Sequence, residues 1–144
     1  MRCDIEPGDF IVIDQSGVNC GLMGSNNTLI CLRAGARGLV CNGGVRDTDE
    51  LILQKVPFWS ATISHTSVQG RLQFAEMNVP VNVGGVEVHP GDVVVADGDG
   101  VVVVPAGLAE DVAAYARDEI TSDKAARRGL YDDLGLPHDP TVGD

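Results

Sequence analysis

An arginine next to an aspartate, in the run Asn42-Gly43-Gly44-Val45-Arg46-Asp47, is the motif with the clearest chemistry. Glycines after a strand let the backbone come close to a ligand and expose amide donors. The forked cation of Arg46 suits a carboxylate or a developing enolate oxygen, and the carboxylate of Asp47 suits a hard cation. The plainer alternative is a turn that carries a surface ion pair.

A glycine-containing loop from Gly17 to Gly24, just before a predicted helix, is the second candidate. The N-terminus of a helix offers free N–H groups and a partial positive charge to a small anion. The loop has neither the Gly-Lys-Ser/Thr of a phosphate-binding loop nor the G-x-G-x-x-G of a dinucleotide site. An ordinary connection from strand to helix is an equally good interpretation.

Other polar groups point to structural roles. The run ADGDG at 96–100 lies between two valine-rich stretches, which is typical of a hairpin turn rather than a metal site. His65 has no carboxylate beside it in the sequence, and Ser64 lacks the G-x-S-x-G of a hydrolase nucleophile. We expect Trp59 in the core.

Cys31 and Cys41 lie in apolar surroundings and are expected to be small core residues. The four cysteines of the chain show no C-x-x-C spacing and no nearby histidine, which argues against a zinc site, and no secretory signal supports a disulfide framework. The four positions are Cys3, Cys20, Cys31 and Cys41.

The chain of 144 residues, 44% of them hydrophobic, is long enough for one ordinary domain with a core of its own. The net charge of −11, from 10 Lys+Arg and 21 Asp+Glu, repels phosphate backbones and anionic lipids. An anionic substrate would therefore need a local cation, either a metal or an arginine. Without a signal sequence or a run of about 20 apolar residues, we expect a cytoplasmic protein.

Apolar runs bounded by turn residues predict a mostly β fold of the α/β class. Strands are expected at 10–13, 38–41, 56–61, 77–83, 85–88, 93–96 and 101–104. Helices are expected at 25–36, with Ser25, Asn26 or Asn27 as N-cap, at 49–53 and at 108–128. We predict one domain over 1–130 and a loose tail over 131–144.

One octapeptide pattern occurs twice. PGDFIVID at 7–14 and PGDVVVAD at 90–97 agree position by position as a turn, a buried strand and a closing acid. Two copies predict two equivalent strands in one sheet or barrel, because a solenoid needs more repeats.

Together these segments resemble the RraA-like family, which includes regulators of ribonuclease E activity and 4-hydroxy-4-methyl-2-oxoglutarate aldolases. The resemblance covers about residues 6–128. It rests on EPGDFIVID, TLICLRAGARGLVCNGGVRDTDEL, NVPVNVGGVEVHPGDVVVADGDGVVVVP and AEDVAAYARDEI.

The resemblance implies a β/β/α swivelling domain, similar to phosphohistidine domains, in trimers or dimers of trimers with sites between subunits. It also implies a lyase that cleaves 4-hydroxy-2-oxo acids and decarboxylates oxaloacetate through a pyruvate enolate held on Mg²⁺ or Mn²⁺. Arg46 would stabilise the enolate and Asp47 would bind the metal. The start of the 25–36 helix would receive the substrate carboxylate, at Gly24, Ser25, Asn26 and Asn27.

Three departures from the family pattern matter. Ser25 stands where the aldolases carry an acidic metal ligand, and a neutral hydroxyl should lower metal affinity. Asn42-Gly43 replaces the family's Asp-Gly. The chain also begins close to the EPGD strand, where family members carry several dozen earlier residues, so we expect reliance on oligomer contacts or on a partner chain. An acid from a neighbouring subunit maps loosely to Glu119 or Asp123.

The sequence is compatible with three hypotheses. The first is a metal-dependent carbon–carbon lyase. The second is a non-catalytic regulator of a ribonuclease, which the serine at position 25 favours. The third is a diverged family member or partner subunit with other chemistry.

Overall fold

The computed structural model describes residues 4–143. The chain divides into two compact units, one up to Pro105 and the other from Ala106 onward. The domain limits 1–130 and 131–144 stay a prediction. Within the described part, no helix is both long and apolar enough to cross a membrane.

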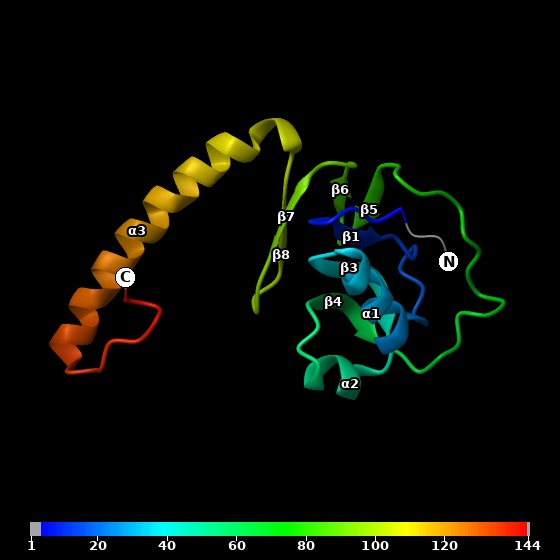
Figure 1. Ribbon diagram of the computed structural model, residues 1–144, viewed down its shortest axis with the longest axis horizontal. Helices are drawn as coiled ribbons and strands as arrows, with labels where there is room; N and C mark the ends of the chain where they lie inside the picture. Colours follow the sequence, from blue (N-terminus) through cyan, green and yellow to red (C-terminus); the bar gives the residue numbers. More distant parts are fainter. Residues whose placement is uncertain (1–3, 144) are drawn as a thin grey trace. The chain divides into compact units, whose positions relative to one another are not determined.

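The first unit is built on a parallel sheet with β3 at its centre (Figure 1). β1 and β2 pair with one side of β3, and β4 pairs with the other. Valine and isoleucine dominate these strands because branched side chains fit a pleated surface. The bounds are Phe10–Ile13 for β1, Gly21–Met23 for β2, Gly38–Val45 for β3 and Phe58–Ile63 for β4.

Two helices belong to this sheet, α1 (Ser25–Ala34) and α2 (Thr48–Leu53). Helix α1 packs its buried Cys31 against Met23 and Leu39, and these residues form the core of the unit. It ends two residues earlier than the sequence predicts because Gly35 adopts a left-handed conformation, with φ of 115°. A side chain at Gly35 would also clash with the backbone of Pro7.

Four further strands form two separate antiparallel hairpins. At the tip of the second hairpin, Asp97 Oδ1 accepts hydrogen bonds from Asp99 N at 2.8 Å and Gly100 N at 3.2 Å, which confirms the predicted hairpin turn. The strands are β5 (Val81–Val83), β6 (Val86–Val88), β7 (Val93–Ala96) and β8 (Val101–Val104).

The repeated octapeptide forms the same turn twice. Asp9 Oδ2 accepts a hydrogen bond from Glu6 N and Asp92 Oδ2 accepts one from His89 N, each at 2.8 Å. The strands that follow lie in different sheets, however: β1 pairs in parallel with β3 in the first sheet, whereas β7 belongs to the second hairpin. The expectation of one shared sheet was wrong because the repeat encodes the turn, not the pairing partner.

Two strand predictions also need correction. Strand β3 does not stop at Asn42-Gly43-Gly44 but continues to Val45, because small residues let neighbouring backbone approach. Strand β2 falls inside the segment predicted as a glycine loop. Its three residues are too short to give a periodic signal.

Asp14, at the end of β1, ties three strands together. Its Oδ1 accepts hydrogen bonds from Asn42 Nδ2 and Ser16 N, both at 2.7 Å, and its Oδ2 accepts one from Asn82 N at 3.4 Å. The hydrogen bond from Asn42, followed by that from Ser16, holds the pKa of the Asp14 carboxyl below its usual range.

The lowered pKa of Asp14 predicts a pH-dependent stability. The contribution is complete at pH values above the ordinary pKa of 3.8 and is lost as the pH falls through the lowered folded-state pKa. Because the carboxylate is largely exposed, water screens it and the effect should be small. The thermal midpoint should therefore fall less between pH 6 and pH 3 in Asp14→Asn than in the wild type; an equal fall in both proteins would contradict this assignment.

The second unit holds a short 3-10 turn (Ala106–Leu108), helix α3 (Ala109–Leu134) and the C-terminal residues. The end of the chain returns along α3: Arg128 Nη2 donates to Val142 O at 2.7 Å, and Lys124 Nζ donates to Gly143 O at 3.4 Å. Val142 is fully buried within this arrangement.

Candidate functional site

The candidate site lies where the carboxyl ends of three parallel strands meet. Strand β2 ends at Met23 and leads into Gly24, β3 leads into Arg46, and β4 leads into Ser64. Arg46 N donates to Met23 O and Ser64 N donates to Val45 O, both at 2.9 Å, so the ladder continues one residue beyond the strands. This end of a parallel sheet is the usual place for ligands in α/β folds.

Arg46 is fixed by backbone carbonyls of β2. Its Nη1 donates to the carbonyl oxygen of Gly21 and, at 3.2 Å, to that of Leu22. Within the described residues, Nη2 makes no hydrogen bond, and 39% of the side chain is exposed. The guanidinium is therefore held on one side and has donors to spare for an anionic or keto oxygen.

Asp47 reaches across to the start of α1. Its Oδ2 accepts a hydrogen bond from Ser25 N at 3.1 Å and lies 3.5 Å from Ser25 Oγ and 3.8 Å from Arg46 Nε. A carboxylate at the N-terminus of a helix is stabilised by the helix dipole. Asp47 also has a left-handed backbone, with φ of 59°, a conformation that occurs more often at functional sites than elsewhere.

Two glycines make this close approach feasible. A Cβ on Gly24 would collide with Asp47 Oδ2 and would lie 2.9 Å from Arg46 Cγ. A Cβ on Gly44 would lie 2.7 Å from Cys20 O and 2.8 Å from Ser64 Cβ. A Cβ on Gly44 would therefore meet fixed backbone, and a Cβ on Gly24 would displace the side chains of Asp47 and Arg46 from their present positions.

The beginning of α1 differs from the expectation in one respect. Gly24, not Ser25, Asn26 or Asn27, is the N-cap residue, and no side chain caps the helix from within. Asp47 takes that role through Ser25 N. The amides of Asn26 and Asn27 precede the first helical hydrogen bond, from Thr28 N to Gly24 O at 3.0 Å, and are the donors that a small anion could use.

The donors available for a metal are few. Asp47 supplies one carboxylate, and the Ser25 hydroxyl lies next to it. Across residues 4–143, no group of three or more His, Cys, Asp or Glu side chains is gathered as a metal cluster. This donor set fits Mg²⁺, which commonly binds through one or two carboxylates and keeps several waters, but it predicts low affinity.

The remaining sequence predictions fall elsewhere. Glu119 and Asp123 lie on α3, in the second unit. Cys31 and Cys41 are buried, which confirms the expectation of core residues, and Cys20 is buried as well. Burial raises the pKa of the Cys41 thiol. His65 is exposed.

Ser64 lies at this end of the sheet, directly after β4, a place that the sequence motifs did not predict. The side chain is 6% exposed, its Oγ donates to Asn19 O at 3.4 Å, and Thr66 N donates back to it at 3.3 Å. The signal that could have found it is its position directly after a strand parallel to β3.

The face of the sheet opposite α1 borders a cleft of 440 Å³. Its walls come from the sheet and from both hairpins, and half of the lining residues are valines. Trp59, half-buried at this cleft and not in the core, donates from Nε1 to Asp97 O at 2.7 Å and contacts the ring of Phe10. The other lining side chains include Val12, Val40, Val86 and Val101.

Comparison with known proteins gives a consistent result. Residues 3–103 match the profile of the RraA-like family, described as Aldolase/RraA. A relative from Halalkalibacterium halodurans, named "Putative 4-hydroxy-4-methyl-2-oxoglutarate aldolase", is 32% identical over 134 residues. That match covers 91% of this chain and 62% of the relative, so the chain spans less than two thirds of the relative's length.

Solved structures agree in fold. An uncharacterized protein from Pseudomonas syringae superposes with a TM-score of 0.80 at 32% identity, covering 92% of this chain and 66% of the other. Streptomyces coelicolor RraAS2, described as an unusual member of the RNase ES inhibitor RraA protein family, gives a TM-score of 0.76 at 34% identity. That match covers 86% of this chain and 64% of the other, and the two likenesses confirm the predicted fold class.

Proposed function

Because the chain belongs to the RraA-like family, we propose that it is a divalent-metal-dependent carbon–carbon lyase. The substrate class is a 4-hydroxy-2-oxo acid, with oxaloacetate decarboxylation as a related activity, and the reaction passes through a pyruvate enolate. The observation that carries the proposal is the corner at Arg46 and Asp47, tied to β2 by one residue and to α1 by the other.

Arg46 would act on the keto oxygen of the substrate. In oxaloacetate, the bond between C3 and C4 breaks, carbon dioxide leaves, and the electron pair moves into an enolate that is later protonated at C3. A guanidinium already fixed by two carbonyls needs little reorganisation to stabilise the charge that develops on that oxygen. The amides of Asn26 and Asn27 would orient the carboxylate next to the keto group.

Asp47 and Ser25 are the residues that would hold a metal. When bound there, Mg²⁺ or Mn²⁺ would supply a second positive charge near the substrate's keto oxygen. In a chain with a net charge of −11, this cation and Arg46 supply the local positive field that an anionic substrate needs.

We propose that the active form is a homo-oligomer, a trimer or hexamer, or contains a partner chain that supplies further elements. The apolar walls of the 440 Å³ cleft support a covered state, since monomers seldom leave such surfaces open. Glu119 or Asp123 would be the acid contributed to a neighbouring site. A monodisperse monomer with one cooperative melting transition would contradict this arrangement.

The test of the proposed reaction is pyruvate release by the full chain. With Mg²⁺ or Mn²⁺, oxaloacetate and 4-hydroxy-4-methyl-2-oxoglutarate should give pyruvate faster than metal alone, and a chelator should abolish the excess. Asp47→Ala, assayed at the same metal concentration, corrects for the decarboxylation that free metal ions promote. No excess over that control with either metal would overturn the lyase assignment.

Ser25 provides a separate prediction about the metal. In Ser25→Asp, a second carboxylate would lie beside Asp47, so like charges should lower the thermal midpoint without metal. With Mg²⁺ bound, the added ligand charge should raise affinity by about tenfold or more. Calorimetric titration and melting curves measure both effects, and Ser25→Asn, a neutral variant of the same size, is the control that should show neither.

A non-catalytic regulator of a ribonuclease is the second candidate, and Ser25 in place of an acidic ligand favours it. Likeness to an RNase ES inhibitor family member supports the same reading. This alternative predicts a stable complex with a ribonuclease in a pull-down and no lyase activity. A third alternative, a diverged member or partner subunit with other chemistry, predicts neither result.

A further inference from the structure

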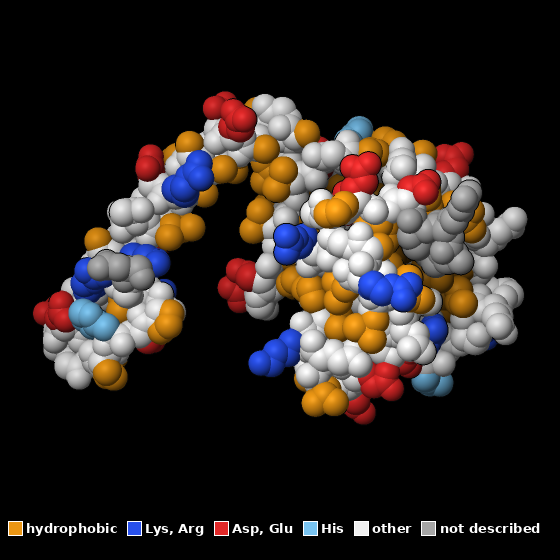
Figure 2. All heavy atoms as spheres, viewed as in Figure 1, with side chains coloured by type: hydrophobic (Ala, Val, Ile, Leu, Met, Phe, Trp, Pro, Cys, Tyr) orange, Lys and Arg blue, Asp and Glu red, His pale blue; other side chains and the backbone are white. Residues whose placement is uncertain are grey.

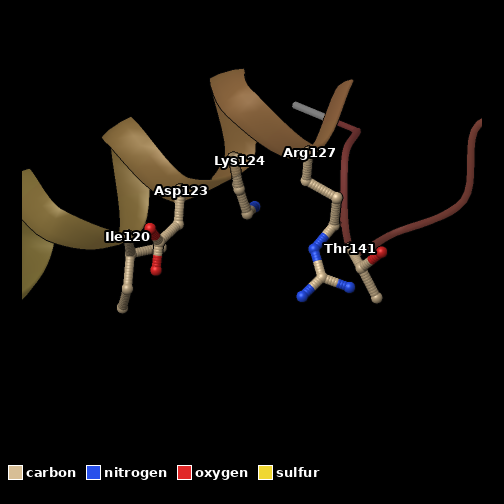
Figure 3. Close-up of a pocket in the computed structure, with 5 residues that line it drawn as sticks. All are labelled: Ile120, Asp123, Lys124, Arg127 and Thr141. Carbon is tan, nitrogen blue, oxygen red and sulfur yellow. The ribbon is translucent and has the colours of Figure 1, made fainter. Parts of the chain in front are cut away.

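Gln15, which follows the end of β1, carries a polar atom that is both buried and unpaired. The side chain is 2% exposed, and within residues 4–143 no group donates a hydrogen bond to its Oε1. Charged side chains, by contrast, are visible at the surface (Figure 2), and Asp123, Lys124 and Arg127 line an open hollow of 230 Å³ on α3 (Figure 3). A buried carbonyl oxygen without a donor lowers stability, so stability alone does not explain the amide of Gln15.

The other end of the amide makes one hydrogen bond to the backbone. Gln15 Nε2 donates to Cys20 O at 3.2 Å. Since a backbone carbonyl only accepts, Nε2 and not Oε1 must face it. Cys20 O also accepts a hydrogen bond from Leu22 N at 2.9 Å, so it would stay paired without Gln15. The hydrogen bond from Gln15 is therefore not needed to satisfy a buried oxygen, and what it adds is a constraint on position.

This constraint falls on the peptide group between Cys20 and Gly21. Gln15 holds the oxygen of that group, and its N–H, which belongs to Gly21, donates to Thr66 O at 2.9 Å. A planar peptide group that is held at both ends restricts the direction of the next carbonyl along the chain. That carbonyl, Gly21 O, accepts a hydrogen bond from Arg46 Nη1. Gln15 thus acts on the anchor of the guanidinium without touching Arg46.

Strand β2 needs such support because its own pairing is irregular. It has three residues, and its register against β3 shifts within that length. The amide of Gln15 lies against β3 at Gly43, where a Cβ would come within 2.6 Å of its Cδ and Oε1. The backbone of Gln15 is fixed as well, since Gln15 N donates to Asn42 Oδ1 at 2.6 Å. A side chain held by β3 therefore supports β2 where the ladder is incomplete.

We propose that Gln15 is a positioning residue for Arg46. By holding the peptide group before Gly21, its amide keeps Gly21 O directed at Nη1, and the unpaired Oε1 is the cost of carrying the donor at this place. The effect of Gln15 on the mobility of Arg46 does not depend on the reaction. The effect on catalysis rests on the proposed function.

Gln15→Met tests the effect on Arg46 in the full chain. Methionine has a similar size but neither the donor nor the unpaired acceptor, so the thermal midpoint should stay the same or rise. The Arg46 side chain should become more mobile. In protein labelled with ¹⁵N-arginine, the heteronuclear NOE of Arg46 Nε–Hε should fall toward that of the exposed Arg33. The signal of Arg46 is assigned by its absence in Arg46→Lys.

The kinetic measurement uses the same variant. At saturating metal, kcat for pyruvate release should fall by about tenfold in Gln15→Met, because a misplaced guanidinium stabilises the developing charge less well. KM should change less than kcat, since that charge exists mainly in the transition state. A side chain with only a structural role would lower the thermal midpoint instead, and would leave kcat of the folded protein unchanged.

Gln54→Met is the matched control. Gln54 is exposed at the C-terminal end of α2, and the same exchange there should leave the Arg46 signal, the thermal midpoint and kcat unchanged. Gln15→Leu removes the amide with a shorter side chain and repeats the test if methionine disturbs the fold.

The inference and the proposed function fail separately. If the wild type releases no pyruvate, the lyase proposal fails, and the NMR comparison still decides the role of Gln15. The inference is wrong if Arg46 stays as rigid in Gln15→Met as in the wild type, or if kcat of an active protein is unchanged. It is also wrong if Gln15→Met and Gln15→Leu both melt well below the wild type, since Gln15 would then be needed for stability.

Discussion

Arg46→Ala should lower kcat/KM for oxo-acid cleavage by about 10²–10³-fold, the cost typical of removing one donor that stabilises a developing oxyanion. Nη1 is anchored to the carbonyls of Gly21 and Leu22, so the guanidinium meets the substrate in a fixed position. Because the stabilised charge exists mainly in the transition state, the loss should fall on kcat more than on KM. Pyruvate release at saturating metal measures both constants.

Arg46→Lys separates charge from geometry. Lysine keeps the positive charge but cannot hold two carbonyls and an oxygen in one plane, so it should recover only part of the lost activity. Circular dichroism must show an intact fold in both variants. Full activity in Arg46→Ala would show that this side chain takes no part in the reaction. The lyase proposal would then lack the group that stabilises the enolate oxygen.

Gly24→Ala should reduce the same activity by about a hundredfold, because small misplacements of catalytic groups have effects of that size. The added methyl would occupy the space of Asp47 Oδ2 and would approach Arg46 Cγ to 2.9 Å. To accommodate it, both side chains must leave their present positions, and the hydrogen bond from Ser25 N to Asp47 must lengthen. Metal affinity and kcat should therefore fall together.

Gly107→Ala is the matched control for the substitution at Gly24. A Cβ at Gly107 meets nothing within 4 Å, and its backbone needs no left-handed conformation. Its activity and melting temperature should stay close to those of the wild type. If Gly24→Ala is equally silent, the corner of Arg46 and Asp47 is not the reacting site.

Much of the fold follows from local sequence. Runs such as Phe10–Ile13 and Val101–Val104 are short, rich in β-branched residues and bounded by turn residues, so the local sequence is enough to predict them as strands. Strand β2 was not predicted, because a three-residue strand among glycines shows no hydrophobic periodicity. The local sequence also does not predict which strands pair with each other, since pairing depends on contacts between residues that are distant along the chain.

The site was predictable in part. Arg46 and Asp47 are adjacent, and their chemistry can be read without a structure. That Asp47 binds the amide of Ser25, 22 residues earlier, could not be read, because it depends on how β2 and β3 end beside each other. The same holds for Gly24, whose need to be glycine arises from a side chain that approaches from another strand.

The position of Trp59 has a practical consequence. It is the only tryptophan in the chain, it borders the valine-lined cleft, and its indole nitrogen is held by a carbonyl of the neighbouring hairpin. Whatever enters the cleft, or draws the hairpin away, alters the polarity around one indole ring. Intrinsic fluorescence thus provides an optical reporter for this face of the molecule, without a dye or an engineered label.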